Sequence, residues 1–217
     1  MASDATLKKQ RTSRQLQRRE DILSAARRLI TERGYGGVNM RDLAKESGVA
    51  PKTLYHQFEN KENLLRTAVE DRFRYLYRLI DDEDVDRGID RLYFILDAVA
   101  DSMKQNLAYA QALIPLLTEP LTDTFSRIRL DTYRKAVDQI AQEGEFVDWV
   151  DIEMISALIY RQVNPIYLAA NRANSPEQSW IKHAKLDISL IIASVSTGYT
   201  HDKAIDVAQA MQASLKH

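Results

Sequence analysis

The chain has 217 residues, 45% of them hydrophobic and 28% charged, which is enough apolar content for one core and a small second domain. It contains no cysteine, which excludes disulfides and thiolate metal sites formed by this chain. No apolar run reaches the roughly 18 residues that a membrane span needs, and the start MASDATLKKQ lacks the apolar core of a signal peptide. We therefore expect a cytoplasmic protein that does not bind membranes.

The charge is distributed unevenly, although the net charge is only −1. Residues 1–61 carry 13 Lys/Arg and 7 Asp/Glu, a balance of +6, so residues 62–217 carry −7. A basic head on an acidic body places the attraction for polyanions at one end. Residues 1–17 are polar and basic, and we predict that they form a flexible arm. The arm is either a solvated tail or a segment that contacts phosphates.

Two helices are predicted directly after this arm. Apolar residues recur at spacings of three and four over 18–33, and Gly34 is suited to the left-handed conformation that ends a helix. Asn39 is a suitable N-cap for a second helix over 40–47, which Gly48 would end.

A third helix is predicted after a tight turn. Pro51 suits the first turn of a helix, where its missing N–H costs nothing. Leu54 and Phe58, four residues apart, would form the inward face. Two short helices joined by a three- to four-residue turn that contains glycine form a helix-turn-helix. We therefore predict a small DNA-binding domain over 18–62.

The remaining sequence predicts only helices. After Asn60, a suitable N-cap, an apolar stripe with helical period runs to Ile80. Further helices are predicted at 86–105, 107–117, 120–143, 149–173, 176–197 and 201–215. The fold class is therefore all-α with about ten helices, and residues 63–217 form a second, larger helical domain.

The run from Gly34 to Leu65, GYGGVNMRDLAKESGVAPKTLYHQFENKENLL, resembles the signature of the tetracycline-repressor (TetR) family. The resemblance rests on the Gly-Tyr after the first helix, the Arg-Asp-Leu-Ala second helix, the Gly-Val turn and the Thr-Leu-Tyr-His-x-Phe third helix. Two departures stand out, because Asn39 replaces a frequent Thr and Pro51 replaces a small residue, and Pro51 would alter how the third helix enters the groove. The resemblance covers about 65 residues.

The resemblance implies a homodimeric transcriptional repressor, and we expect a protein that is not an enzyme and needs no cofactor. Its partners would be a pseudo-palindromic double-stranded DNA operator and a small-molecule effector that releases it. The second domain would bind the effector and form the dimer. An alternative is a helical DNA-binding adaptor or nucleoid-associated protein without an inducer.

The third helix would lie in the major groove with its N-terminal residues nearest the base edges. Lys52 and Thr53 are the predicted base readers, since lysine donates to guanine and threonine offers a hydroxyl and a methyl group. The resemblance makes Tyr55 and His56 a phosphate-contacting pair, and Lys61 adds charge at a helix N-terminus. The full predicted set is Arg41, Ala50, Pro51, Lys52, Thr53, Tyr55, His56 and Lys61.

The middle helices are rich in aromatic residues with polar groups among them. The residues predicted to line an effector cavity are Phe73, Tyr77, Tyr93, Phe94, Asp97, Tyr109, Phe125, Tyr133, Tyr160, Arg161 and Asn164. Aromatic residues at helical spacing are also what an ordinary core contains. Arg161 lies on an otherwise apolar helix, where it would either meet an acidic effector or pair with Asp97 or Glu153.

Two further expectations concern dimerisation and catalysis. The helices 149–173 and 176–197 carry the apolar stripes best suited to a dimer interface, although an internal core would produce the same pattern. Catalysis and a metal site are not expected, because the histidines show no metal-ligand spacing and no glycine-rich phosphate loop is present. The histidines are His56, His183, His201 and His217.

Overall fold

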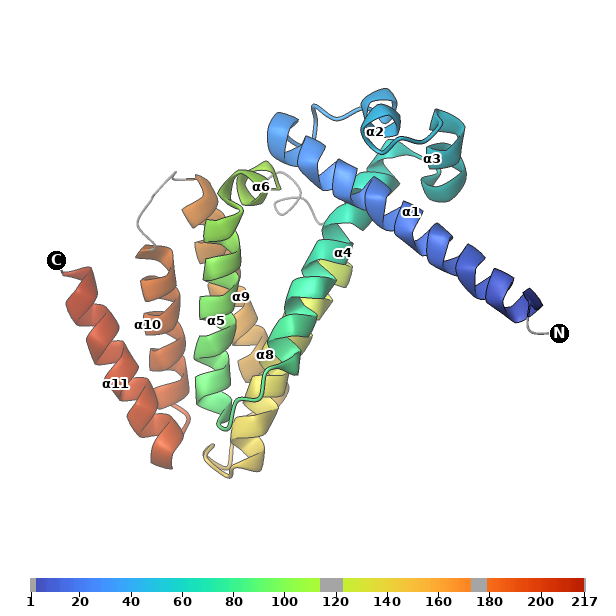
Figure 1. Cartoon of the computed structure of the whole chain (residues 1–217). Helices are drawn as coiled ribbons and strands as arrows, with labels where there is room; N and C mark the ends of the chain where they lie inside the picture. The colour runs from blue at the N-terminus through green and yellow to red at the C-terminus, as the bar shows by residue number, and fades with distance from the viewer. Residues whose placement is uncertain (1–2, 114–122, 173–178, 217) are drawn as a thin grey trace. The chain divides into compact units, whose positions relative to one another are not determined.

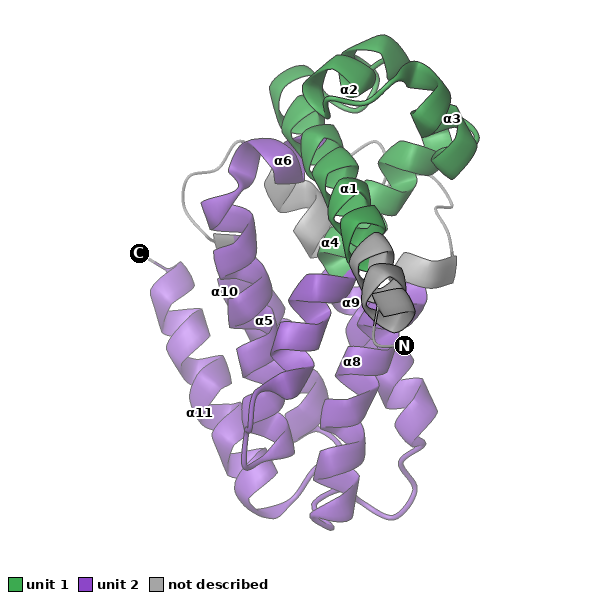
Figure 2. Cartoon of the chain, turned by 45° about the vertical axis from the view of Figure 1, so that its right-hand side comes forward, with its two compact units in different colours: residues 1–73 green, residues 74–217 purple. Residues whose placement is uncertain are grey.

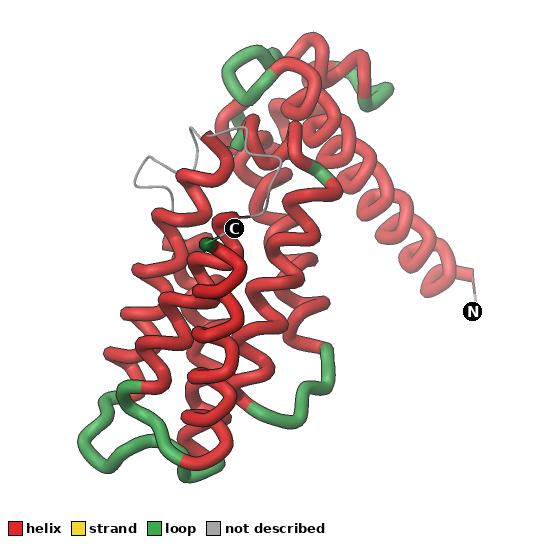
Figure 3. The backbone as a smooth tube through the Cα atoms, turned by 90° about the vertical axis from the view of Figure 1, so that its left-hand side faces the viewer, coloured by secondary structure: helices red, strands yellow, loops and turns green. Residues whose placement is uncertain are grey.

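The computed structural model describes residues 3–113, 123–172 and 179–216, with side chains for 13–113, 126–163 and 180–216. These residues form ten helices and no regular strand, which confirms the all-α prediction (Figures 1 and 3). The helices are α1 (Ser3–Arg33), α2 (Met40–Glu46), α3 (Pro51–Phe58), α4 (Lys61–Asp82), α5 (Gly88–Gln105), α6 (Leu107–Ala112), α8 (Asp123–Gln142), α9 (Ile152–Arg172), α10 (Ser179–Ala193) and α11 (Gly198–Leu215). None of the helices in the described ranges is long and apolar enough to span a membrane.

The chain divides into two compact units, Met1–Phe73 and Arg74–His217 (Figure 2). The first contains α1, α2, α3 and the first part of α4. We expected a boundary near residue 62, but α4 runs without interruption through that position and carries the first unit on to Phe73.

The first unit is held together by the apolar face of α1 and the inward faces of α2, α3 and α4. Its fully or almost fully buried side chains include Ile22, Leu23, Ala26, Leu29, Ile30, Leu43, Leu54, Phe58, Leu64, Leu65 and Ala68. Asn39 caps α2 as predicted, because its Oδ1 accepts the N–H of Asp42 at 3.0 Å. Gly34 and Gly48 adopt φ +70° and +65°, which are left-handed values that favour glycine.

Helix α1 begins at Ser3, whereas we predicted a flexible arm over residues 1–17. The segment contains neither proline nor glycine, and it is rich in lysine, arginine, glutamine and leucine. These residues lose little side-chain freedom in a helix, so the helical run propagates through them from the packed part of α1. Residues 13–20 are all exposed, so the polar composition of that stretch reflects contact with solvent and not a lack of structure.

The second unit packs α5 against α8 and α10, with α9 between α8 and α10. Helices α10 and α11 lie side by side and run in opposite directions (Figure 1). A buried hydrogen bond of 2.8 Å joins the Tyr93 hydroxyl on α5 to the Ser189 hydroxyl on α10. An isolated antiparallel bridge between Phe146 and Ser196 ties the loop after α8 to the loop before α11.

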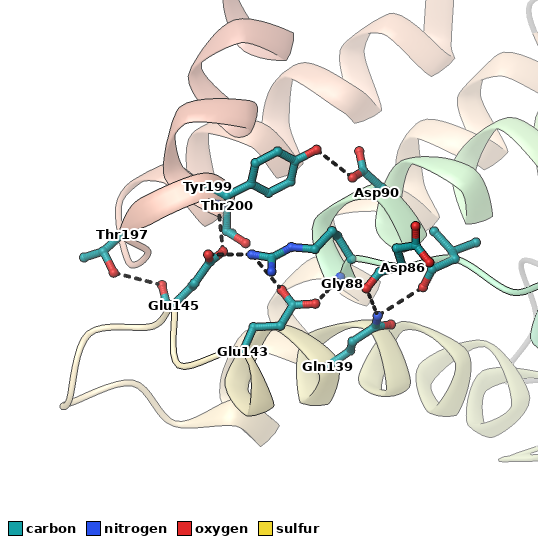
Figure 4. A network of polar contacts seen from close by, with 11 residues as sticks. Asp86, Gly88, Asp90, Gln139, Glu143, Glu145, Thr197, Tyr199 and Thr200 are labelled. Carbon is teal, nitrogen blue, oxygen red and sulfur yellow. Dashed lines mark hydrogen bonds and ion pairs between the residues drawn. The ribbon is translucent and has the colours of Figure 1, made fainter.

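Two glutamates in the loop that follows α8 cap two other helices of this unit (Figure 4). Glu143 accepts the N–H of Gly88 at the start of α5 at 2.9 Å. Glu145 accepts the N–H of Thr200 in the first turn of α11 at 2.8 Å. Arg87 forms ion pairs with both glutamates, at 3.5 Å from Glu143 and 2.5 Å from Glu145. The network thus satisfies N–H groups that each helix end leaves without a partner.

The same network extends along α11. The Tyr199 hydroxyl donates to Asp90 at 2.8 Å, Lys203 lies 3.3 Å from the same carboxylate, and the Arg87 guanidinium stacks over the Tyr199 ring at 4.9 Å. Both Tyr199 and Asp90 come from helix starts, so the contacts hold the beginnings of α11 and α5 together.

Candidate nucleic-acid interface

Helix α3 has two faces of opposite character. Leu54 and Phe58 are buried, at 0% and 1% exposure, and fix the helix to the core of the first unit. Lys52, Tyr55 and His56 lie on the outer face, and Tyr55 is 52% exposed although it is a large aromatic residue. The outer face therefore offers a cation, an aromatic hydroxyl and an imidazole to an external partner.

The residues at the start of α3 are also accessible. Ala50 and Pro51 are exposed, and Thr53 is partly exposed. Ala50 stands at the N-cap with extended backbone and its side chain makes no capping hydrogen bond, while Pro51 occupies the first turn as predicted. Apolar groups thus stand at the tip of the helix, and Lys52 and Thr53 carry the hydrogen-bonding groups nearest to it.

The two predicted residues outside α3 occupy the starts of neighbouring helices. Arg41 is exposed in the first turn of α2. Lys61 opens α4 with a side chain that is 30% exposed and lies 3.7 Å from Glu62. Asn60 caps α4, since its Oδ1 accepts the N–H of Asn63 at 2.7 Å. Both cations therefore stand beside helix N-termini, whose N–H groups favour anions.

Ion pairing leaves part of the positive charge of the first unit uncompensated. The paired arginines are Arg27 with Asp71, Arg28 with Glu46, and Arg33 with Asp42. Arg41 and Lys52 form no ion pair with any residue that the structure describes. Arg41 on α2 and Lys52 on the outer face of α3 are therefore uncompensated positive charges, which attract a polyanion.

The residues predicted to line an effector cavity differ in exposure. Tyr77, Tyr93 and Tyr133 are buried; Phe73, Phe94, Tyr109 and Tyr160 are partly exposed; Asp97 and Arg161 are exposed. The side chains of Phe125 and Asn164 lie outside the described residues. Burial raises the pKa of Tyr93 to about 12, and its hydroxyl already bonds Ser189. Tyr93 is therefore part of the core.

The structure places Arg161 on the exposed side of α9, which contradicts its predicted role as a cation inside the second unit. Its two expected partners bond other residues, since Asp97 pairs with Lys185 at 2.7 Å and Glu153 pairs with Arg134 at 2.8 Å. The reason is the helical phase: Arg161 lies two residues from the buried Ile159, and thus on the opposite side of the helix.

Among the described residues of the second unit, Arg129 on α8 is a buried cation, and our sequence analysis did not single it out. It is 9% exposed, donates to the Tyr160 hydroxyl at 3.1 Å and stacks over the Tyr160 ring at 5.2 Å. No local sequence pattern predicts the contact between Arg129 and Tyr160, because the two residues are 31 positions apart. A buried guanidinium beside an aromatic hydroxyl is a group that can bind a carboxylate or phosphate.

A hollow of about 420 Å³ lies elsewhere on the second unit, beside α8. It is lined by Asp81, Ile128, Asp131, Thr132, Arg134, Lys135 and Asp138. Its charges are largely satisfied by one another, since Lys135 pairs with Asp81 and Arg134 pairs with Asp138. Within the described residues, no group of three or more acidic or histidine side chains is arranged to hold a metal ion.

The first unit, with α3 packed by one face and exposed by the other, is a helix-turn-helix module of the kind that enters the major groove. Residues 22–68 match the model of the bacterial regulatory proteins of the tetR family. Residues 22–68 thus resemble the DNA-binding domain of that family.

The relatives agree with this assignment. The HTH-type transcriptional repressor KstR of Rhodococcus jostii is 29% identical over 134 residues, which cover 62% of this chain and 58% of KstR. Across the first curated relatives that it matches, the chain spans about half of their length.

Solved structures share the fold at low sequence identity. A TetR transcription regulator from Haloarcula marismortui superposes with a TM-score of 0.70 at 18% identity, covering 83% of this chain and 99% of that one. FadR from Bacillus subtilis, solved in complex with stearoyl-CoA, gives 0.64 at 17% identity, covering 81% and 98%. The likeness therefore extends beyond the helix-turn-helix into the second unit.

Proposed function

We propose that the chain is a homodimeric transcriptional repressor that binds a pseudo-palindromic DNA operator and is released by a small-molecule effector. The observation that carries the proposal is the outer face of α3, which exposes Lys52, Tyr55 and His56 while Leu54 and Phe58 hold the helix in place. The resemblance of residues 22–68 to the tetR family supports it.

In this proposal α3 lies in the major groove and divides its contacts between bases and backbone. Lys52 and Thr53 face the base edges from the N-terminal turn, and Ala50 and Pro51 make apolar contacts there. Tyr55, His56, Lys61 and Arg41 bind phosphates around the groove. Sequence preference therefore depends on few polar groups, chiefly Lys52 and Thr53.

Dimerisation is proposed through the second unit. Large apolar side chains are exposed on or next to α9 and α10: Leu190 is 54%, Met154 63% and Trp149 75% exposed. A protein seldom leaves such residues exposed in groups unless another chain covers them. A two-fold dimer would present two α3 helices to half-sites about 34–36 Å apart, or a multiple of that distance.

We place the effector in the second unit, beside Arg129 and Tyr160. The buried guanidinium favours an effector with a carboxylate or phosphate group. FadR of Bacillus subtilis, which shares the fold, was solved with stearoyl-CoA, a ligand that carries phosphates. By linkage, an effector that weakens DNA binding must itself bind more weakly to the DNA-bound protein. The proposal assigns no catalytic residue and no cofactor.

Footprinting tests the proposal against the adaptor alternative. Genomic fragments of the source organism that the purified protein retains would be footprinted at increasing protein concentration. A repressor protects one short pseudo-palindrome at low concentration. Broad protection without a preferred sequence would instead identify a DNA-coating adaptor and overturn the proposal.

A further inference from the structure

The N-terminal half of α1 forms a charged surface outside the helix-turn-helix. Residues 13–20 are all exposed, so this part of the helix contributes almost nothing to the core of the first unit. It carries three arginines, Arg14, Arg18 and Arg19. Because this segment is exposed on all sides, packing against the rest of the unit does not explain which side chains it carries.

The arginines in the two halves of α1 differ in their ion pairing. In the C-terminal half, Arg27, Arg28 and Arg33 are each paired with an acidic side chain of the same unit. Within the described residues, the side chains of Arg14 and Arg18 form no ion pair and no hydrogen bond. Their charge therefore stays available to an external anion, whereas the charge of the C-terminal half is compensated internally.

Arg19 connects this surface with α3. Its guanidinium lies over the ring of Phe58, 4.8 Å from the centroid. Phe58 is the last residue of α3, two positions after His56 and three before Lys61. The free arginines of α1 thus begin beside the end of α3 that carries the proposed phosphate-binding residues.

We propose that the exposed N-terminal half of α1 is a second DNA-binding surface, which contacts backbone phosphates beyond those bound by the helix-turn-helix. Arg14 and Arg18 are four residues apart and lie on one side of the helix, with a rise of about 6 Å between them. This rise is close to that of two phosphate steps along one strand, at about 3.4 Å of axial rise each. The inference rests on the DNA binding proposed above.

The sequence continues the same stripe toward the N-terminus. Lys8 and Arg11 precede Arg14 at spacings of three residues, so their positions fall on the side of the helix that bears Arg14 and Arg18. Continuous helix from Ser3 keeps these positions in register, which a disordered arm would not do. The surface is therefore a basic stripe whose contacts are independent of base sequence.

The test compares salt dependence on a duplex of random sequence. Fluorescence anisotropy would measure binding of the full chain between about 50 and 200 mM salt. Each phosphate contact contributes about 0.9 to the slope of log K against log salt. The double variant Arg14→Gln/Arg18→Gln should lower the slope by about 2 and weaken binding on the order of 50-fold at 0.1 M salt.

Two further variants separate local charge from net charge and from helix structure. The control Lys104→Gln/Arg127→Gln removes two exposed cations from the second unit and should leave the slope unchanged. The variant Arg14→Lys/Arg18→Lys keeps the charge and should retain the wild-type slope.

An unchanged slope in Arg14→Gln/Arg18→Gln, with wild-type protein still binding the duplex, would overturn the inference and leave the proposed repressor intact. An equal loss in the second-unit control would also overturn it, because net charge alone would then explain the effect. Absence of any wild-type binding would refute DNA binding itself, and with it both proposals.

Discussion

Gly88 occupies the first position of α5, where the backbone of that helix approaches α8. A Cβ added there would lie 2.6 Å from both the Ala136 carbonyl oxygen and the Ile140 Cγ1. The Ala136 oxygen belongs to the backbone of α8, so the clash cannot be relieved by a side-chain rotation. The glycine is required by close approach and not by its backbone angles.

We predict that Gly88→Ala lowers the free energy of unfolding by about 2 kcal/mol, since overpacking outweighs the gain in helix propensity. Urea unfolding followed by circular dichroism would measure the change. The matched control is Gly36→Ala, whose added Cβ meets nothing within 4 Å and which should stay within about 0.5 kcal/mol of wild type. Equal stability of the two variants would show that α5 and α8 are further apart than described.

Single residues also show where prediction from sequence succeeded. Leu54 and Phe58 are four residues apart and therefore predict the buried face of α3. The helical period then places Tyr55 and His56, which lie between them in sequence, on other sides of the helix. The exposure of Arg161 was equally open to this reasoning, since it is out of phase with Ile155, Ile159 and Val163. The burial of Arg129 could not be predicted in this way, because its contact with Tyr160 depends on how α8 packs against α9.

Helix starts in the second unit depend on groups far away in sequence. Burial acts to raise the pKa of Glu145, but the hydrogen bonds from Thr200 and Arg87 outweigh it and hold the pKa below its ordinary value of 4.5. A carboxyl with a depressed folded-state pKa stabilises the fold at pH values above 4.5. That contribution is lost as the pH falls from 4.5 through the folded-state pKa.

We therefore predict that Glu145→Gln lowers stability at neutral pH by about 1 kcal/mol and makes stability less dependent on pH below 4.5. Thermal unfolding at a series of pH values between about 7 and 3 measures both effects. Glu83→Gln, at an exposed position after α4, is the control and should follow the wild-type curve. A parallel acid decline in wild type and Glu145→Gln would contradict the role assigned to this carboxylate.

The same contact explains an error in the predicted elements. The sequence predicted a helix from 201, with Gly198 in the break before it, yet α11 begins at Gly198. Glu145 accepts the N–H of Thr200 and supplies the cap that Thr197 does not provide through its own side chain. A cap from 55 residues away leaves no local signal. By contrast, α2 starts where predicted because its cap, Asn39, is adjacent in sequence.

The structure of the first unit can be predicted from the sequence more completely than the structure of the second. The first unit is built from short-range signals: caps, glycine stops and an ordered motif over about 30 residues. The second unit is built from contacts among α5, α8, α9, α10 and α11. Helical period located those helices, but the side chains that meet inside the unit follow from packing, which the sequence pattern does not encode directly.

The proposed dimer interface can be tested by a substitution that changes the oligomeric state. Leu190→Asp should convert the protein to monomer, because a carboxylate would replace an exposed apolar side chain on the proposed α10 interface. Sedimentation velocity measures the change. Leu107→Asp alters a comparably exposed leucine, 47% against 54%, on α6 and should remain dimeric. A dimer that persists in Leu190→Asp, or one that dissociates equally in both variants, would place the interface elsewhere.

Binding-site selection from a random duplex library would show whether α3 reads DNA sequence. Wild-type protein and the exposed second-unit variant Lys104→Ala should converge on the same short pseudo-palindrome. Lys52→Ala should select a site altered at the base pairs that Lys52 contacts, with each lost contact worth about 1–3 kcal/mol of discrimination. Failure of the wild-type protein to converge on any sequence, or an unchanged site for Lys52→Ala, would contradict the proposal that α3 reads DNA sequence.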